Sequence, residues 1–172
     1  MIDESHFFLG SSIPAILRTY GDSLPKAIKD NKKYRGVESF VVFFEFFGPN
    51  SFAGWHDPEV KEREVVVFDI SLYKKGFIPP RDFLNDIGHL KIPKVIYEGN
   101  FNKQFIEDVK EGKYPVFEGI VAKGINENKK SNPIWMCKVK TKQWLEELKN
   151  RMAQSEEFRK SWNDNIKEQY DG

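Results

Sequence analysis

The chain has 172 residues, 40% of them hydrophobic, which is enough for one domain with a sizeable core and too few for two full domains. The 27 Lys and Arg residues nearly balance the 26 Asp and Glu residues, which excludes a whole-molecule attraction to nucleic acid and leaves only a local basic patch. A single cysteine, Cys137, excludes an internal disulfide, and no apolar stretch approaches the roughly 18 residues of a membrane span, so we expect a cytoplasmic protein without a membrane partner.

The first part of the chain predicts a strand, a turn and a helix. Residues 6–22 combine a short apolar stretch with Gly, Ser and Pro, which indicates a strand that runs into a turn. Residues 23–34 follow, with Ser23 and Pro25 in positions typical of a helix start. We therefore expect a short helix at 23–34.

Two long apolar runs then predict buried strands, and each contains an acidic residue. Residues 36–48 are almost continuously apolar and aromatic, with Glu45 near the end of the run. Residues 62–78 form a second run with Asp69 in its middle, and the run ends in a Lys-Lys-Gly turn that makes a hairpin or an edge. We expect both acids to be buried.

The rest of the chain mixes helices and strands, so the fold class is α+β. Two helices and three strands are expected, the helices at 79–90 and 102–114 and the strands at 91–100, 116–125 and 133–141. In the last strand, alternation places Lys138 and Lys140 on one face. The polar tail at 142–172 predicts a helix with a packing stripe of Trp144, Leu145, Leu148, Met152 and Phe158.

Charged residues embedded in apolar runs are the unusual feature of this sequence. Taken singly, each has an ordinary explanation: Glu45 could bind a backbone amide, Asp69 could end a strand, and the strand lysines could lie on a solvated face. Burying a charge is costly, however, unless the charge is paired or binds a ligand. Several strands that each place a charged group beside apolar neighbours therefore favour a shared polar site.

The order of these segments resembles the covalent nucleotidyltransferases, the superfamily of ATP-dependent DNA ligases, RNA ligases and mRNA capping enzymes. Four segments are similar to the family's third motif, the strand that follows it, the fourth motif and the fifth motif: FFEFFG at 43–48, VVVFDI at 65–70, FEGIVAK at 117–123 and CKVKT at 137–141. RTYGD at 18–22 is similar to the segment that follows the nucleophile motif. The resemblance implies that Arg18 contacts the substrate phosphate or the nucleotide.

The resemblance also implies a role for each of five further residues. Glu45 would accept hydrogen bonds from the ribose hydroxyls of ATP, and Phe68 would stack on the adenine. Glu118 would help to hold Mg²⁺ or Mn²⁺, because carboxylate oxygens suit these cations beside a phosphate. Lys138 and Lys140 would offset the negative charge on the phosphates in the transition state.

In this family the lysine of a Lys-x-Asp-Gly motif attacks the α-phosphate of ATP, and the lysine–AMP adduct passes AMP to the 5′-phosphate of an RNA or DNA end. The chain contains no Lys-x-Asp-Gly. The nearest string, Lys33-Tyr34-Arg35-Gly36, has arginine in place of the acid and follows the Arg18 segment. We therefore expect the chain to bind ATP, AMP and nucleic-acid ends without adenylylating itself.

The resemblance implies an ATP-grasp-like nucleotidyltransferase domain of antiparallel sheets flanked by helices at 1–141, without its first strand or strands, and a helical C-terminal tail at 142–172. The short helix before FEGIVAK and the helical tail after the fifth motif favour an RNA ligase over a DNA ligase. The alternatives are a capping guanylyltransferase, a non-catalytic nucleotide- or nucleic-acid-binding remnant, and one half of a split ligase whose partner, an N-terminal fragment, supplies the lysine.

Overall fold

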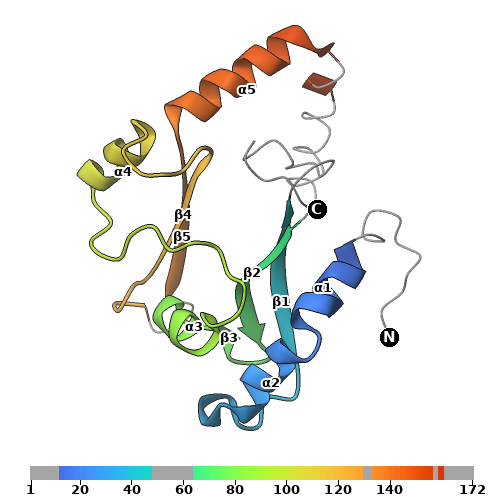
Figure 1. The fold of residues 1–172 in the computed structure, drawn as a ribbon. Helices are drawn as coiled ribbons and strands as arrows, with labels where there is room; N and C mark the ends of the chain where they lie inside the picture. The colour runs from blue at the N-terminus through green and yellow to red at the C-terminus, as the bar shows by residue number, and fades with distance from the viewer. Residues whose placement is uncertain (1–11, 48–63, 130–132, 157–158, 161–172) are drawn as a thin grey trace. The chain divides into compact units, whose positions relative to one another are not determined.

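A computed structural model of the protein describes residues 12–47, 64–129, 133–156 and 159–160. The described chain has a mixed α+β fold with small antiparallel sheets (Figure 1). Its elements, in chain order, are α1 (Ser12–Tyr20), α2 (Ser23–Asp30), η1 (Lys32–Tyr34), β1 (Phe40–Phe47), β2 (Glu64–Leu72), β3 (Gly76–Phe77), α3 (Pro80–Ile87), α4 (Lys103–Lys110), β4 (Gly119–Ile125), β5 (Ile134–Lys140) and α5 (Lys142–Gln154). None of the described helices is both long and apolar enough to cross a membrane.

Most of the predicted elements are confirmed, and two predictions are wrong. The turn predicted before Gly21 is the helix α1, whose Ile16, Leu17 and Tyr20 follow helical spacing. Residues 91–100 form no strand, although Val95, Ile96 and Tyr97 are residue types that favour strands, because their backbone joins neither sheet. The strand expected in residues 6–11 lies outside the described residues.

The chain divides into two compact units. Unit 1 consists of Met1–Val95 and Lys123–Met136, and unit 2 consists of Ile96–Ala122 and Cys137–Gly172. The strands β4 and β5 pair with each other and contribute residues to both units. The predicted division into a domain at 1–141 and a tail at 142–172 stays a prediction, although α5 does begin at Lys142.

Unit 1 contains a three-stranded antiparallel sheet in the order β1-β2-β3. One face of this sheet forms the core together with α1, α2 and α3. The buried members of the core are Tyr20, Leu24 and Ile28 from the helices α1 and α2, Tyr34 from η1, Val65, Val67, Ile70 and Leu72 from β2, Ile78 after β3, and Phe83 and Ile87 from α3. From β1, alternate residues pack against the same core, namely Phe40, Val42 and Phe44.

A β-bulge interrupts the pairing of β1 with β2. Phe43 pairs with Asp69, but the next residue, Phe44, pairs with Val67, so Phe68 is an extra residue in β2. A bulge reverses the alternation of side chains along its strand. For this reason Val67 and Ile70, three residues apart, both face the core and are completely buried.

The hydroxyl of Tyr20 anchors α1 to the sheet. It lies 3.0 Å from the carbonyl oxygen of Val65 and 2.5 Å from that of Lys91, and it accepts a hydrogen bond from the backbone N–H of Val67 at 3.2 Å. Burial raises the pKa of Tyr20, since the ionised phenolate would be poorly solvated. This one side chain therefore ties α1, β2 and the segment after α3 together.

We expect Tyr20→Phe to lower the free energy of unfolding by about 1–3 kcal/mol, because buried backbone groups lose a hydrogen-bond partner. Chemical denaturation monitored by circular dichroism measures the change. Tyr73→Phe is the matched control, since Tyr73 is 60% exposed in the turn between β2 and β3. Equal stabilities of the two variants would contradict the anchoring role.

A second polar contact fixes η1 to α3. Tyr34, which is buried, donates a hydrogen bond of 2.6 Å from its hydroxyl to Asp86, and Lys33 lies 3.1 Å from the same carboxylate. Burial alone would raise the pKa of Asp86, but the hydrogen bonds from Tyr34 and Lys33 outweigh it and hold that pKa below its ordinary value. The carboxylate thus stabilises unit 1 in its ionised form.

A carboxyl group whose pKa is lowered by folding stabilises the folded state above the pKa that it has in the unfolded chain, about 4. This stabilisation is lost as the pH falls through the pKa of the group in the folded state. We expect Asp86→Asn to cost about 1–3 kcal/mol at pH 7. The difference from the wild type should shrink below pH 4. Urea unfolding between pH 7 and pH 2 tests this. The matched control is Asp30→Asn, which removes an exposed ion pair with Lys26 and should change the stability far less.

Unit 2 has a small core of its own. It consists of Phe105 and Val109 from α4 and Val139 from β5, with the aromatic rings of Phe101 and Tyr114 packed edge-on against Phe105.

The packing stripe predicted for the tail is confirmed at Trp144, which is buried, and at Leu148 and Met152, which are half-buried. It is wrong at Leu145, which is 40% exposed, because one residue beyond Trp144 a helix turns its side chain away. Phe158 lies outside the described residues.

Candidate functional site

The residues predicted to form the site are divided between the two units. Arg18, Glu45 and Phe68 belong to unit 1, on α1, β1 and β2 respectively. Glu118, Lys138 and Lys140 belong to unit 2. Glu118 lies just before β4, and the two lysines lie in β5. The two groups are therefore described separately.

The prediction that Glu45 is buried is wrong, whereas the prediction for Asp69 is confirmed. Glu45 is exposed, and Asp69 is only 5% exposed. Glu45 pairs with Val66 across the sheet, and its neighbour Phe44 packs against the core, so Glu45 points to the opposite face. An exposed carboxylate at this position needs no internal partner and can accept hydrogen bonds from a ligand.

The bulge residue Phe68 lies close to that same face. It is half-buried, and its ring centroid lies 6.2 Å from that of Phe43, which pairs with Asp69. Because Phe43 and Glu45 are two residues apart on β1, they share a face. The face opposite the core therefore carries Glu45, Phe43 and Asp69, with the ring of Phe68 beside them; we call it the bulge face.

An ion pair between Lys123 and Asp69, which is largely shielded from solvent, lies at the bulge in β2. Lys123 of β4 places its ammonium nitrogen 2.8 Å from Asp69 and 2.6 Å from the carbonyl oxygen of Phe68. Its side chain is 19% exposed and that of Asp69 is 8% exposed. The same nitrogen lies 5.4 Å from the ring centroid of Phe68 and 5.9 Å from that of Phe83, within the range of cation–π attraction.

In unit 2, Lys140 forms an ion pair with Glu118 and lies 4.3 Å above the ring of the buried Trp144. The two charged side chains are 31% and 24% exposed, so solvent still reaches both. The structure thus brings together two of the residues predicted to act on the phosphates and the metal.

Gly119 has a steric reason to follow Glu118. Its φ is +147°, and a Cβ at this position would lie 2.8 Å from the Cα of Lys140 and would also clash with the carbonyl of Val139. Only glycine therefore allows β4 and β5 to approach so closely. The Glu-Gly pair in FEGIVAK places Glu118 beside the last residue of β5.

Thr141 joins this ion pair to the start of α5. Its backbone N–H donates to the carbonyl oxygen of Glu118 at 2.9 Å, and its hydroxyl donates to that of Phe117 at 2.5 Å. The hydroxyl also accepts from the backbone N–H of Trp144 at 3.1 Å, which makes Thr141 the N-cap of α5. One buried side chain therefore fixes the segment before β4 against the end of β5.

The two remaining predicted residues lie at the surface. Lys138 is exposed and Val139 after it is buried, which confirms that Lys138 and Lys140 share one face of β5. Arg18 is exposed on α1. Both cations are accessible to an anionic ligand.

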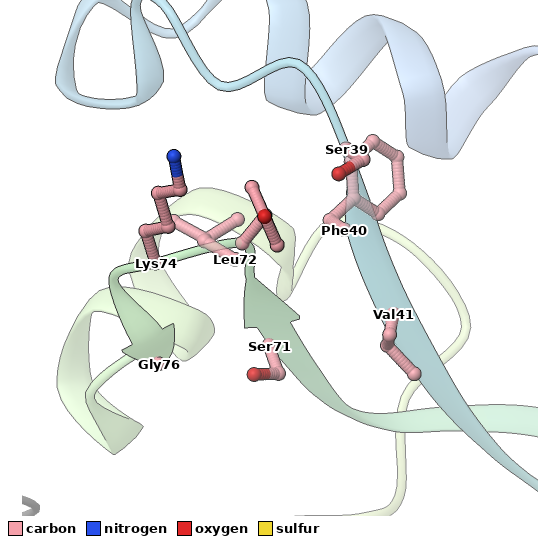
Figure 2. Close-up of a pocket in the computed structure, with 8 residues that line it drawn as sticks. Ser39, Phe40, Val41, Ser71, Leu72, Lys74 and Gly76 are labelled. Atoms are coloured by element: carbon pink, nitrogen blue, oxygen red, sulfur yellow. The ribbon is translucent and has the colours of Figure 1, made fainter.

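An open groove of about 350 Å³ lies at one end of the unit 1 sheet (Figure 2). It is lined by Ser39, Phe40 and Val41 at the start of β1 and by Ser71, Leu72, Tyr73, Lys74 and Gly76 around the β2–β3 turn. None of the predicted site residues lines it, so the groove gives no support to a function for them.

A divalent metal fits the residues of unit 2 only together with a phosphate. The described residues include no group of three or more His, Cys, Asp or Glu side chains that could hold a metal ion. Mg²⁺, however, is commonly bound by one or two carboxylates and the phosphates of a nucleotide. Glu118 could supply one such carboxylate, in exchange for its ion pair with Lys140.

The structure adds Asp69 and Lys123 to the candidate site. The sequence predicts that Asp69 is buried and places Lys123 at the end of FEGIVAK, but it implies no role for either residue. The signal was present, because a buried carboxylate needs a cation and Lys123 is a lysine in a separate apolar strand. The pairing itself could not be found, since 54 residues separate them in the chain.

Removing Lys123 alone should lower the free energy of unfolding more than neutralising Lys123 and Asp69 together. We expect Lys123→Met to lower the free energy of unfolding by about 3–5 kcal/mol, because Asp69 then keeps an uncompensated buried charge. Lys123→Met combined with Asp69→Asn should recover part of that loss. Thermal and urea unfolding of the single and double variants measure this, and additive losses would contradict the buried pairing.

Comparisons of the chain with protein-family models, with curated proteins and with solved structures find no match in any of the three.

Proposed function

We propose that this chain is the nucleotide-binding part of an ATP-dependent polynucleotide ligase, most similar to RNA ligases, that binds ATP or AMP and nucleic-acid ends without adenylylating itself. In this proposal Glu45 and Phe68 bind the adenosine, Lys138 and Lys140 bind the phosphates, and Glu118 helps to hold Mg²⁺ or Mn²⁺. The fold behind the proposal is the ATP-grasp-like nucleotidyltransferase domain that the order of the motifs implies.

The bulge face is the observation that carries the proposal. It presents a half-buried aromatic ring, Phe68, and an exposed carboxylate, Glu45, on neighbouring strands. Bulges often lie next to active sites, where they redirect a side chain. An aromatic ring can stack on a base, and a carboxylate can accept hydrogen bonds from both ribose hydroxyls.

The lysines of β5 support the phosphate part of the proposal. Lys138 and Lys140 share a face, and Lys140 is already held beside a carboxylate and above an aromatic ring. Preorganised cations stabilise phosphate charge without having to reorganise during the reaction. A bound divalent ion would neutralise charge on the phosphates as well, and Glu118 is the residue we expect to hold it.

The sequence contains no Lys-x-Asp-Gly, the motif whose lysine becomes adenylylated in this family. Formation of lysine–AMP needs an amine placed in line with the α-phosphate, and no other residue of the chain matches that motif. Binding of adenosine and phosphates depends on different residues. We therefore propose a domain that binds its nucleotide but needs AMP already attached to the 5′ end, or a partner lysine, for sealing.

Calorimetric titration with ATP and Mg²⁺ tests the binding. We expect Phe68→Ala to weaken ATP binding by about 1–3 kcal/mol, or roughly 5- to 150-fold in Kd, because the adenine loses its stacking partner. Tyr73→Ala, which removes an exposed aromatic ring in the turn that follows β2, should leave the Kd unchanged. A wild-type chain that binds no ATP at millimolar concentration would refute the proposal.

The predicted lack of self-adenylylation has a separate test. Incubation with radiolabelled ATP and Mg²⁺ should leave no label on the protein, and a covalent AMP adduct would overturn this part of the proposal. Incubation with a pre-adenylylated RNA strand and a 3′-hydroxyl acceptor should yield the joined product if sealing is retained. The same reaction with DNA strands compares the two substrate classes.

A further inference from the structure

The contacts of Lys123 are concentrated on two consecutive residues of β2. Its ammonium nitrogen is bonded to the carbonyl oxygen of Phe68 and to the carboxylate of Asp69, and it lies 5.4 Å from the centre of the Phe68 ring. An ammonium group has three donors, so most of its bonding capacity is used here. Lys123 thus contacts the backbone of Phe68, the ring of Phe68 and the carboxylate of Asp69.

The position of these contacts at a bulge gives them a particular effect. The extra residue of a bulge is left out of the regular ladder of hydrogen bonds, so the ladder does not fix its conformation. The charged hydrogen bond to the Phe68 carbonyl supplies the missing restraint. The cation–π contact with the ring restrains the side chain of the same residue.

The charge of Lys123 is largely balanced by Asp69. The two groups are 2.8 Å apart and mostly shielded from water, at 19% and 8% exposure. A cation in such a pair adds little net attraction for a phosphate group nearby. The exposed Lys138 differs in this respect, since its side chain is accessible to a ligand.

We propose that Lys123 is a positioning residue that holds the ring of Phe68 in the orientation in which it stacks on adenine, and that it does not bind the phosphates. The inference rests on the proposed function, because it takes Phe68 as the stacking residue. It adds a division of labour among the motif lysines: Lys123 orients the base-binding ring, and the lysines of β5 serve the phosphates.

A series of ligands with increasing numbers of phosphates separates positioning from phosphate binding. We expect Lys123→Met to weaken the binding of adenosine, AMP and ATP by the same factor, about 3- to 30-fold. Lys138→Met should instead weaken ATP far more than adenosine. A loss in Lys123→Met that grows with the number of phosphates would show that Lys123 is a phosphate ligand and would overturn the inference.

Stacking itself can be followed with an adenosine analogue whose base is fluorescent and is quenched by contact with an aromatic ring. We expect the wild type to quench the bound analogue, Phe68→Ala to abolish the quenching and Lys123→Met to reduce it. The effect of Lys123→Met should largely vanish in the background of Phe68→Ala, because Lys123 acts through that ring. Additive effects of the two substitutions would overturn the inference.

Three further variants guard against loss of folding. Lys123→Arg should restore part of the affinity, since guanidinium can also bond a carbonyl and a carboxylate. Lys123→Met with Asp69→Asn removes the uncompensated charge and should still show the uniform loss. Lys74→Met is the matched control, because Lys74 lies 5.2 Å from an exposed ring, that of Tyr73, and should have no effect.

The outcomes separate the two proposals. If the wild type binds neither adenosine nor ATP, the proposed function fails and the positioning role fails with it. If the wild type binds and Phe68→Ala loses affinity, but Lys123→Met and the neutral double variant bind normally, only the positioning role is refuted.

Discussion

The extra residue in β2 is the constraint on which the arrangement of unit 1 depends. Without it, strict alternation from Val67 would turn Asp69 toward the core and Ile70 away from it. The bulge lets Val67 and Ile70 both reach the core, where both are completely buried, and leaves Asp69 on the other face. The same irregularity brings Phe68 beside that face, so one local feature serves both the packing of the core and the candidate site.

Each unit pairs an acid with a lysine of the later motifs. In unit 1, the buried Asp69 is paired with Lys123, and the carbonyl of Phe68 shares that lysine. In unit 2, Glu118 and Lys140 are paired but remain partly open to solvent. The more buried pair is suited to fixing structure, and in the proposed function the more exposed pair would exchange partners when a phosphate or a metal binds.

Small structural residues explain why these charged groups lie where they do. Gly119 allows β5 to approach the segment that carries Glu118, and Thr141 bonds that segment to the first turn of α5. Gly119 and Thr141 therefore each have a steric or hydrogen-bonding role in the fold that does not depend on a ligand.

The sequence by itself determined most of the elements, because helical spacing, alternation and capping are local properties: α2, α3, α4 and both long strands follow from them. It also indicated that charges in apolar strands need partners. Only the tertiary structure decided which strand faces are buried, so that Glu45 is exposed and Asp69 is not, and why residues 91–100 form no strand. It also decided that Lys123 is the partner of Asp69. These outcomes depend on strand register and on contacts between residues as far apart as 55 positions, as in the bond from Lys123 to Phe68, and local patterns carry no information about such contacts.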